Sequence, residues 1–537
     1  MNTASAITRW ILWTGAITGI VLVLSPVFIM VWDSFIVQGE FTTASYHDVL
    51  RFERQWLLLR NSLALAGICT IASVVIGFPL AFLLVRTAVP AKPLLAFCFA
   101  IPLVVPPYIF AMIWGQLLGT QGLVTGMLKE GFSLTEAPYT VHGLAGSAWV
   151  LTLCYYPIIM LTTAAALLSA NAAHEEAGRL FVGWRRALVG ITLRQCLPGT
   201  LIGALLVFIL SLGNFGVPSL LQFHVYALEV YTKFNAFYDM QGATAAAMPL
   251  LVFSLVALFL LKHIQRRHWS VSLSSHRRPL APLPLGRWRW GVFLLALAVI
   301  GISVLLPVAA LIQESGSGHA YYLALKTGWP ELLQSVLIAS IAATAVVFLG
   351  FWMGYVSARG NAWPAAFLDW GTVAAFAIPG TVLGIGLIKL WNRTGWPGLV
   401  YGSIAIVVLA WISRFIVFAQ QGAAFAVRRI DPRLEEAAAI SGVSWPRTIM
   451  HVVLPLLWPF LAALWLLTFM FCLGELSTSV LVSPAGVTTV TVRLFTLMHY
   501  GMNELVAAMS VILLAFLLVP LGLFCVVIRK SSGFGHA

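Results

Sequence analysis

The chain has 537 residues, of which 60% are hydrophobic and only 9% are charged. Soluble globular domains usually carry about a quarter of charged residues, so this composition excludes an ordinary soluble protein and predicts a chain that lies in lipid. The net charge of +13 is not gathered in a basic tail, so it gives no reason to expect nucleic acid as a partner.

About twelve apolar runs follow one another, each near the ~20 residues that a membrane-spanning helix needs. In the first half the runs cover 10–32, 57–85, 94–118, 141–170, 199–222 and 244–264. In the second half they cover 288–312, 331–357, 366–391, 399–426, 456–482 and 503–528. No small-residue cleavage site follows the first run, so we expect a retained helix and not a signal peptide. The sequence predicts an all-α membrane protein with about twelve transmembrane helices.

The basic residues are distributed unevenly between the loops on the two sides. If the N-terminus is cytoplasmic, most Lys and Arg residues fall in inner loops, above all between Lys262 and Arg289. This asymmetry follows the positive-inside rule, so topology explains the basic clusters without a binding role. It predicts a multi-pass protein of the plasma membrane with both termini in the cytoplasm.

The two halves of the chain resemble each other. Residues 61–86 align with 334–359 at a spacing of 273, and residues 212–221 align with 473–482 at a spacing of 261. The first alignment pairs Gly77 with Gly350 and Arg86 with Arg359. Two similar sets of six helices that both start inside form a parallel repeat, with one path expected between them.

This repeat divides the chain into three parts. We expect a first transmembrane domain at 1–264, a basic cytoplasmic linker at 265–287 and a second transmembrane domain at 288–537. The fold prediction is therefore two tandem six-helix domains.

An acidic segment stands between two apolar runs of the second half. Glu435 and Glu436 follow Asp431 and Pro432, and Gly442 comes soon after. Asp caps helices, Pro suits the first turn, and the glutamates would lie near the positive end of the helix dipole. Gly442 offers a stop. We predict a short helix along the cytoplasmic surface, a turn, and re-entry into the membrane.

The first half holds a counterpart of this segment. Glu175 and Glu176 follow Asn171, which stands at the capping position, and Gly183 comes after them. A solvated interfacial helix is the simpler interpretation of one copy. Two copies at equivalent places favour docking of a partner.

The second copy resembles the EAA loop that marks the permease subunits of ABC importers, through Glu435-Glu436-Ala437, Gly442 and Leu454-Pro455. In that family the loop forms a coupling helix that docks on the ATPase subunit. The resemblance implies an ATPase-docking role for Glu175, Glu176, Ala177, Gly183, Glu435, Glu436, Ala437 and Gly442. The first copy departs from the pattern, because Gly183 comes one residue late and Arg194 stands where Pro455 does. Its docking is therefore expected to be weaker or asymmetric.

The fused layout narrows the resemblance. The phrases "LSLGNFGVPSLL" and "GELSTSVLVSPAGVTTVTVRLFTLMHYG" resemble the ferric-iron uptake permeases, and related permeases for thiamine and aminoethylphosphonate share much of this wording. The resemblance implies ATP-driven import of ferric iron, or alternatively of thiamine or an organophosphonate. It also implies a bacterial inner membrane and an extracytoplasmic binding protein that delivers the substrate.

The ATPase is expected to be a separate subunit. None of the lysines follows a glycine, so the phosphate-binding pattern GxxxxGK[ST] is absent from the sequence. ATP and Mg would then be bound by the partner, in two copies because each loop should engage one. The chain is expected to be a transport subunit and not an enzyme, with no catalytic residue, cofactor or metal of its own.

Polar residues at membrane depth are candidates for the transport path. A carboxylate such as Glu475 is costly there, and its repeat mate is Asn214, so we expect the two to face each other across the path. Ser477 and Thr478 lie close by, and Arg414 inside a span is expected to be structural. The alternative for Glu475 is a structural hydrogen-bond partner.

Two other classes of protein were weighed against a permease. A secondary transporter of two six-helix halves would share the spans and the repeat, but it has no reason to place a docking helix between the fourth and fifth spans of each half. A membrane-embedded enzyme needs a converging cluster of His, Asp, Glu or Ser, which the sequence does not indicate. Copurification with an ATPase subunit separates these classes.

Overall fold

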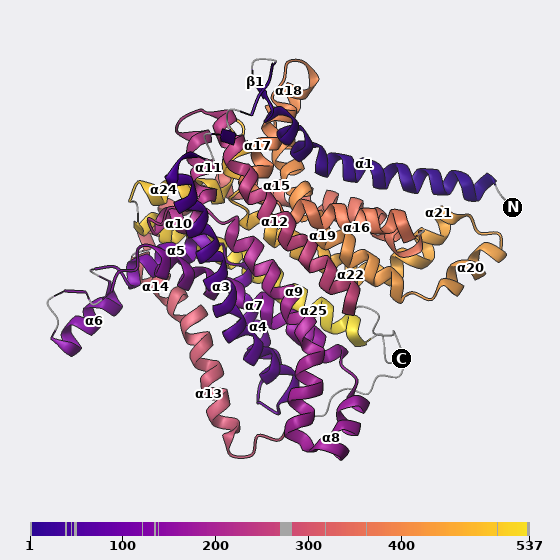
Figure 1. Cartoon of the computed structure of the whole chain (residues 1–537), viewed down its shortest axis with the longest axis horizontal. Helices are drawn as coiled ribbons and strands as arrows, with labels where there is room; N and C mark the ends of the chain where they lie inside the picture. Colours follow the sequence, from indigo (N-terminus) through magenta and orange to yellow (C-terminus); the bar gives the residue numbers. More distant parts are fainter. Residues whose placement is uncertain are drawn as a thin grey trace.

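The computed structural model describes residues 3–37, 40–43, 46–47, 51–120, 122–133, 136–137, 139–268, 282–316, 318–360, 362–501 and 503–533. Within the predicted linker, residues 269–281 lie outside these ranges. Figure 1 shows an almost wholly helical molecule.

The elements fall into the two expected halves. The first half contains α1 (Thr3–Asp33), α3 (Glu53–Arg86), α4 (Lys92–Val104), α5 (Pro107–Leu117), α6 (Leu123–Phe132), α7 (Leu144–Ser169), α8 (Ala172–Ala187), α9 (Arg194–Leu212), α10 (Gly216–Leu220), α11 (Tyr226–Asn235) and α12 (Met240–His268). The second contains α13 (Trp288–Ile300), α14 (Leu306–Glu314), α15 (Gly318–Arg359), α16 (Ala362–Ala377), α17 (Gly380–Trp391), α18 (Trp396–Tyr401), α19 (Ile404–Arg429), α20 (Pro432–Ile440), α21 (Trp445–Thr448), α22 (Leu454–Gly474), α23 (Ser479–Val482), α24 (Val490–His499) and α25 (Asn503–Gly533). The described part of the chain also holds three π-helical stretches, η1 (Leu188–Leu193), η2 (Gly301–Leu305) and η3 (Ile449–Val453), and a small antiparallel hairpin of β1 (Ile36–Val37) and β2 (Glu40–Phe41).

The predicted all-α membrane fold is confirmed, but two spans are not the continuous helices that we expected. In the described part of the chain, ten helices are long and apolar enough to cross a membrane, and two bent pairs bring the number to twelve. The pair α4–α5 bends by 95°, and the pair α16–α17 bends by 105°. Pro106 and Pro379 cause these breaks with extended ψ angles of 130° and 142°, since proline has no N–H for the helix ladder and disfavours helix before it.

The fifth and eleventh spans are shorter than predicted. The expected ranges 199–222 and 456–482 ran past the ends of the helices, because α9 ends at Leu212 and α22 ends at Gly474. In each half a turn and a short helix follow, α10 in the first and α23 in the second. The apolar pattern continues through both turns, which is why hydropathy alone extended the spans.

The repeat is visible in how the helices cross. A β-carbon added to Gly77 on α3 would lie 2.6 Å from the carbonyl oxygen of Tyr156 on α7, and one on Gly350 of α15 would lie 2.3 Å from the Cβ of Ala419 on α19. Both positions therefore allow two backbones to approach closely, as small residues do between membrane helices. The matched glycines of the sequence repeat occupy matched crossings.

The two halves are interlocked by their first helices. Ala16, Ile20 and Val23 of α1 pack in a cluster with residues of α15, α16 and α19, which belong to the second half. In return, the hydroxyl of Ser303 in η2 lies 3.2 Å from that of Tyr156 on α7 in the first half. Each half therefore covers the other with its N-terminal helix.

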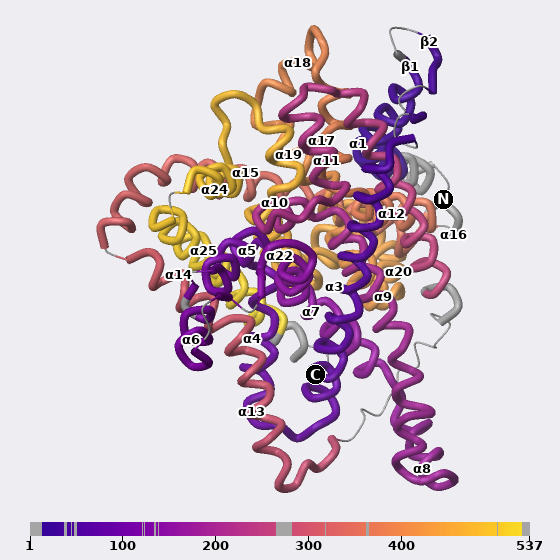
Figure 2. The backbone as a smooth tube through the Cα atoms, turned by 60° about the vertical axis from the view of Figure 1, so that its left-hand side comes forward, coloured from indigo at the N-terminus to yellow at the C-terminus, as the bar shows by residue number. Residues whose placement is uncertain are grey.

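The halves also meet crosswise at the broken helices. A β-carbon on Gly213, at the end of α9, would lie 3.1 Å from Cβ of Pro379, and one on Gly474, at the end of α22, would lie 3.3 Å from Cγ of Pro106. These contacts exchange equivalent positions of the repeat, so a pseudo-two-fold axis runs between them. Figures 1 and 2 place α8 far from the β1–β2 hairpin and α18, at the opposite end of the molecule.

Candidate functional site

The acidic segment of the second half forms the predicted short helix. Asp431 caps α20, since its Oδ1 accepts a hydrogen bond from the backbone N–H of Arg433 at 3.0 Å. The chain then turns at Gly442, whose φ of 79° lies in the region that favours glycine. Glu436 and Ala437 are exposed to solvent on this helix. The helix therefore presents one acidic and several small side chains outward.

Glu435 points inward, in contrast to Glu436. Its Oε1 lies 2.8 Å from Nη2 of Arg359, and its Oε2 accepts a hydrogen bond from the Tyr355 hydroxyl at 2.5 Å. Arg359 and Tyr355 are near the C-terminal end of α15, so this carboxylate ties α20 to a helix long and apolar enough to span a membrane. The resemblance implied a docking role for Glu435, but the contacts of its carboxylate lie within the chain, where they hold α20 against α15.

The first half repeats this arrangement with deeper burial. The Nη2 of Arg86, at the end of α3, donates to both carboxylate oxygens of Glu175 on α8 at 2.7 and 2.9 Å. Arg179 and Thr192 also donate to Glu175. The side chains of Arg86 and Glu175 are 0% and 4% exposed, whereas those of Arg359 and Glu435 are 19% and 16% exposed. α8 is thus more tightly anchored than α20.

The ion pairs that Arg86 and Arg359 make with the glutamates were not predicted from the sequence. The repeat alignment matched Arg86 with Arg359 and assigned neither a role beyond topology. The available signal was that the repeat matches Arg86 with Arg359 and also matches a glutamate in each half. The sequence could not show that they are partners, because 89 residues separate Arg86 from Glu175.

Gly183, with φ 77° and ψ 166°, breaks α8 into two helical parts, and the part before this turn is the counterpart of α20. Asn171 caps this helix as predicted, accepting from the N–H of Ala173 at 3.1 Å. Glu176 and Ala177 are exposed. The displacement of Gly183 by one residue therefore leaves the helix–turn design intact.

Large apolar side chains are exposed at the tips of both helices. Leu180 and Phe181 in the first are 86% and 87% exposed, and Ile440 in the second is 88% exposed. They protrude from the same helices that carry the exposed Glu176 and Glu436. Beyond each turn a π-helical stretch, η1 or η3, leads into the next span, and such stretches are frequent at functional sites.

The path candidates Asn214 and Glu475 perform the same structural task in their two halves. Oδ1 of Asn214 accepts from the N–H of Val217 at 3.0 Å, at the start of α10. The carboxylate of Glu475 accepts from the N–H groups of Thr478 and Ser479 at 2.9 and 3.0 Å, at the start of α23. Among the described residues, no hydrogen bond joins Asn214 to Glu475. Each closes a turn of its own half.

Ser477 and Thr478 lie against the broken helix of the second half. A β-carbon on Gly380, the first residue of α17, would be 2.6 Å from Cβ of Ser477 and 3.0 Å from Oγ1 of Thr478. Arg414 on α19 joins this group, with its Nε 3.6 Å from Oε1 of Glu475. Glu475, Ser477, Thr478 and Arg414 thus form one polar cluster.

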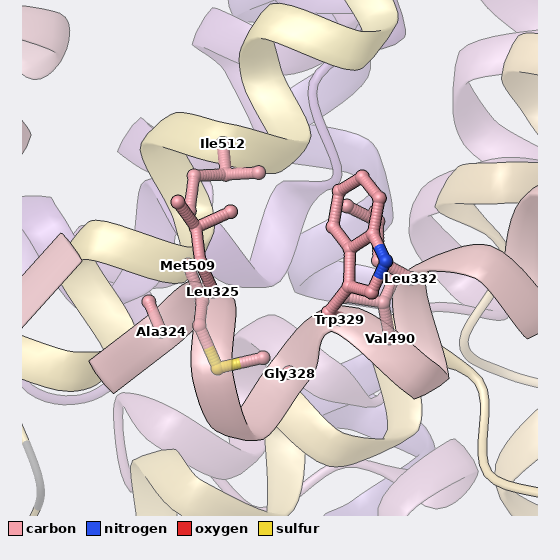
Figure 3. Close-up of a pocket in the computed structure, with 8 residues that line it drawn as sticks. All are labelled: Ala324, Leu325, Gly328, Trp329, Leu332, Val490, Met509 and Ile512. Carbon is pink, nitrogen blue, oxygen red and sulfur yellow. The ribbon is translucent and has the colours of Figure 1, made fainter. Parts of the chain in front are cut away.

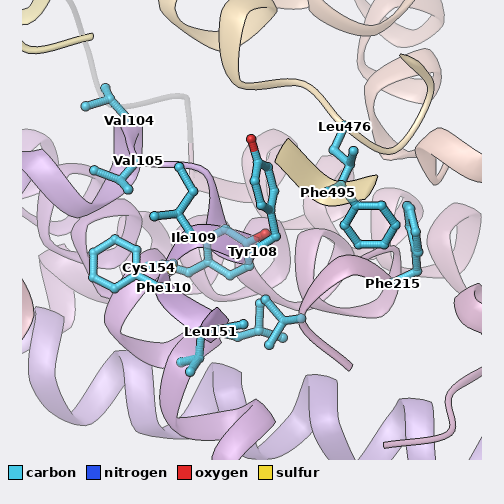
Figure 4. Close-up of a cluster of buried hydrophobic side chains, with 14 of the residues drawn as sticks. Val104, Val105, Tyr108, Ile109, Phe110, Leu151, Cys154, Phe215, Leu476 and Phe495 are labelled. Carbon is cyan, nitrogen blue, oxygen red and sulfur yellow. The ribbon is translucent and has the colours of Figure 1, made fainter. Parts of the chain in front are cut away.

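An aromatic cluster closes the space between the halves beside these turns. Phe215 of the first half and Phe495 of the second meet edge to face, with ring centres 5.6 Å apart, and Tyr108 contacts Phe495 in the same way at 6.4 Å. Figure 4 shows these rings together with Leu476. All four side chains are buried. The two halves are therefore sealed against each other here.

A small pocket lies elsewhere, between the first part of α15 and α25. Its walls are apolar, formed by residues such as Leu325, Leu332 and Met509, with Trp329 at one side (Figure 3). It belongs to the second half alone and is not at the interface of the repeats. We do not assign it to the path.

The sequence matches known proteins over most of its length. Residues 73–270 and 346–531 match the family described as binding-protein-dependent transport system inner membrane component. FbpB 1 of Haemophilus influenzae, which its name assigns to a ferric transport system, is 28% identical over 475 residues, 82% of this chain and 73% of its own length. The ferric transport system permease protein FbpB of Actinobacillus pleuropneumoniae is 25% identical over 519 residues, 91% of this chain and 74% of its own. PhnV of Salmonella paratyphi A, named for 2-aminoethylphosphonate transport, is 28% identical over 230 residues, 42% of this chain and 86% of its own.

Proposed function

The chain belongs to the family of binding-protein-dependent transport system inner membrane components, and on that premise we propose that it is the permease subunit of an ATP-driven ABC importer. Both docking helices would face the cytoplasm, with both termini on the same side, and each would engage one copy of a separate ATPase subunit that binds ATP and Mg. A soluble binding protein would deliver the substrate from outside.

The two anchored helices, α8 and α20, support this proposal. Each has an exposed glutamate and alanine, an exposed apolar tip, and an inward glutamate held by an arginine at the end of a spanning helix. Surface side chains of this kind suit docking in a groove of a partner. The glutamate–arginine pairs would make each helix and its spanning helix move together.

Motion of the ATPase would then reach the transport path through α3 and α15. These helices cross α7 and α19 at Gly77 and Gly350, where the backbones touch. Close packing of this kind transmits displacement instead of absorbing it. The crosswise contacts at Pro106 and Pro379 lie where the halves would separate and rejoin in alternating access.

We propose ferric iron as the substrate. The similarity to two permeases named for ferric transport, over four-fifths or more of this chain, supports it. An organophosphonate is the second candidate, favoured by the similarity to PhnV over part of the chain. Thiamine has only the resemblance in wording described above.

The test is accumulation of radioactive ferric iron by iron-limited cells that lack the chain, carry it intact, or carry Glu436→Arg. We expect the intact chain to restore uptake and the variant to insert in the membrane without restoring it, because the exposed charge is reversed at the docking surface. Glu504→Arg, at the start of α25, is the matched control and should restore uptake. Uptake that is independent of the chain would contradict the substrate, and full activity of Glu436→Arg would contradict the docking role.

A further inference from the structure

The polar cluster at the start of α17 has features of an anion-binding site. α17 is a half-helix of 12 residues that begins at the proline break, and no side chain caps its first turn. The first N–H groups of a helix have no intrahelical partner and carry a partial positive charge. In membrane transporters such half-helix ends at the interface of repeats point at anionic groups of substrates. A helix end alone does not make an anion-binding site, so neighbouring side chains must supply further groups for the anion.

Arg414 supplies a cation at this helix end. A β-carbon on Gly380 would lie 3.2 Å from its Nη1, and Nη1 is 3.4 Å from the carbonyl oxygen of Ile378. Its Nε lies 3.6 Å from Oε1 of Glu475, so the two side chains form an ion pair without a short hydrogen bond. Glu475 is occupied by the N–H groups of Thr478 and Ser479. The guanidinium therefore keeps donors directed at the start of α17.

Two buried hydroxyls at the same place need partners. Thr381 and Thr478 are both 0% exposed, and in the described part of the chain neither Oγ1 has a hydrogen-bond partner. Oγ1 of Thr478 lies 3.0 Å from the β-carbon position of Gly380, so it faces the helix end. A buried hydroxyl without a partner costs about 1–3 kcal/mol. Cβ of Ser477 now fills this position, 2.6 Å from the β-carbon position of Gly380. Once Ser477 moves away from the helix end, a ligand with several acceptor oxygens would satisfy both hydroxyls, the orphan N–H groups and Arg414 together.

The first half lacks this chemistry. The helix crossings match Ile159 with Ala419, a spacing of 260 that places Cys154 at the position of Arg414. Asn214 takes the place of Glu475. The site with the arginine therefore belongs to the second half, and the equivalent position of the first half can serve as a control.

We propose that the start of α17, with Arg414, Thr381 and Thr478, binds the oxyanion group of the transported substrate. This inference rests on the proposed function and specifies its substrate class. Arg414 and Glu475 offset each other's charge, so the site has no net negative charge for a bare ferric ion, and the described residues contain no cluster of three or more His, Cys, Asp or Glu side chains to hold it. Iron would cross with an oxyanion bound to it, whereas a phosphonate would bring its own.

The experiment measures binding of radiolabelled inorganic phosphate to the full chain, assembled with its ATPase subunit in nanodiscs. We expect saturable binding that Arg414→Gln weakens roughly tenfold or more and Thr381→Val roughly threefold or more, as for loss of a charged and a neutral hydrogen bond. Thr381→Val preserves shape, so it reports on the hydroxyl even if Arg414→Gln perturbs the fold. Cys154→Ser is the matched control in the first half and should bind like the intact chain.

Absence of saturable phosphate binding, or equal weakening by Cys154→Ser, would overturn the inference. Retention of the ATPase is recorded on the same samples. A chain that keeps the ATPase but binds no phosphate contradicts only this site, whereas a chain that retains no ATPase contradicts the proposed function. Proteoliposome uptake then distinguishes the sources of the oxyanion: labelled phosphate that enters only with iron indicates a complex, and labelled 2-aminoethylphosphonate that enters without iron indicates a free oxyanion.

Discussion

The Glu175–Arg86 and Glu435–Arg359 ion pairs occupy equivalent positions of the repeat but differ in their exposure to solvent. The first pair is sealed from solvent, and the second is partly open. Removing one partner of a buried pair leaves an uncompensated charge and costs about 3–5 kcal/mol, whereas an exposed pair contributes about 1 kcal/mol or less. The first docking helix, which departs from the family pattern, is therefore the more strongly held.

We expect Glu175→Gln to lower the thermal stability of the purified chain clearly more than Glu435→Gln. Loss of the first carboxylate leaves Arg86 buried without its counter-charge, while Arg359 reaches water more readily. Unfolding followed by tryptophan fluorescence in detergent measures the difference, with the exposed Glu176→Gln as control. An equal or larger effect of Glu435→Gln would show that burial does not govern the two pairs.

The roles of some single residues could be predicted from the sequence, and those of others could not. Asp431 and Asn171 were predicted as helix caps, and both accept the expected backbone hydrogen bond. Those predictions succeed because a cap acts within a few residues of itself. Arg414 was expected to be structural, and its place at the start of α17 emerges only from the approach of three separate elements.

At the scale of elements, the turn after each docking helix depends on glycine. The φ of 77° and ψ of 166° at Gly183 belong to a region essentially restricted to glycine, which costs other residues about 1–3 kcal/mol. We expect Gly183→Ala to misalign α8 and reduce ATPase retention several-fold, although a β-carbon there meets nothing within 4 Å. Gly190→Ala, which also has open space, is the control and should retain the ATPase. Pull-down of the ATPase with each variant decides between them.

The helix crossing at Gly77 gives a second element-scale prediction. A β-carbon there would lie 2.6 Å from a backbone oxygen and 2.8 Å from Cβ of Ile159, so α3 and α7 must move apart. We expect Gly77→Ala to reduce the yield of monodisperse protein strongly, as measured by fluorescence-detected gel filtration. Gly67→Ala adds the same atom to the same helix where nothing lies within 4 Å, and it should be tolerated. Equal yields of both variants would contradict the close crossing.

Hydropathy alone predicted one continuous span for each of the two broken helices. Pro106 and Pro379 were visible in the sequence, yet the apolar runs continue through them, so each pair looked like one span. Proline ends a helix only when the surroundings do not restore its lost hydrogen bonds, and that depends on tertiary contacts. At these prolines the tertiary contacts include those with Gly213 and Gly474, which no local sequence pattern can indicate.

For the whole molecule, the exchange of α1 and α13–α14 between the halves has a direct consequence. Each half leaves apolar surface uncovered unless the other is present. We expect a chain divided within 269–281 to assemble when both fragments are coexpressed, and each fragment alone to be degraded. Coexpression with a tag on one fragment and gel filtration of the complex measures this. A first fragment that is stable alone would contradict the interlocked arrangement.

The number of halves and the repeat were predictable from the sequence because both depend on composition and periodic similarity. The interlocking was not, since the apolar faces of α1 and α13 carry no mark of which half they cover. The same limit holds for the aromatic closure, where Phe215 and Phe495 come from segments 280 residues apart.

In the proposed importer, α8 and α20 of one chain each hold one ATPase subunit. The most direct measurement is native mass spectrometry of the purified complex, which counts ATPase subunits per chain. We expect two for the intact chain, fewer for Phe181→Asp and for Ile440→Asp, and none for the double variant, because each change places a charge at the exposed apolar tip of one helix. A complex without ATPase, or a count that neither substitution changes, would contradict the claim.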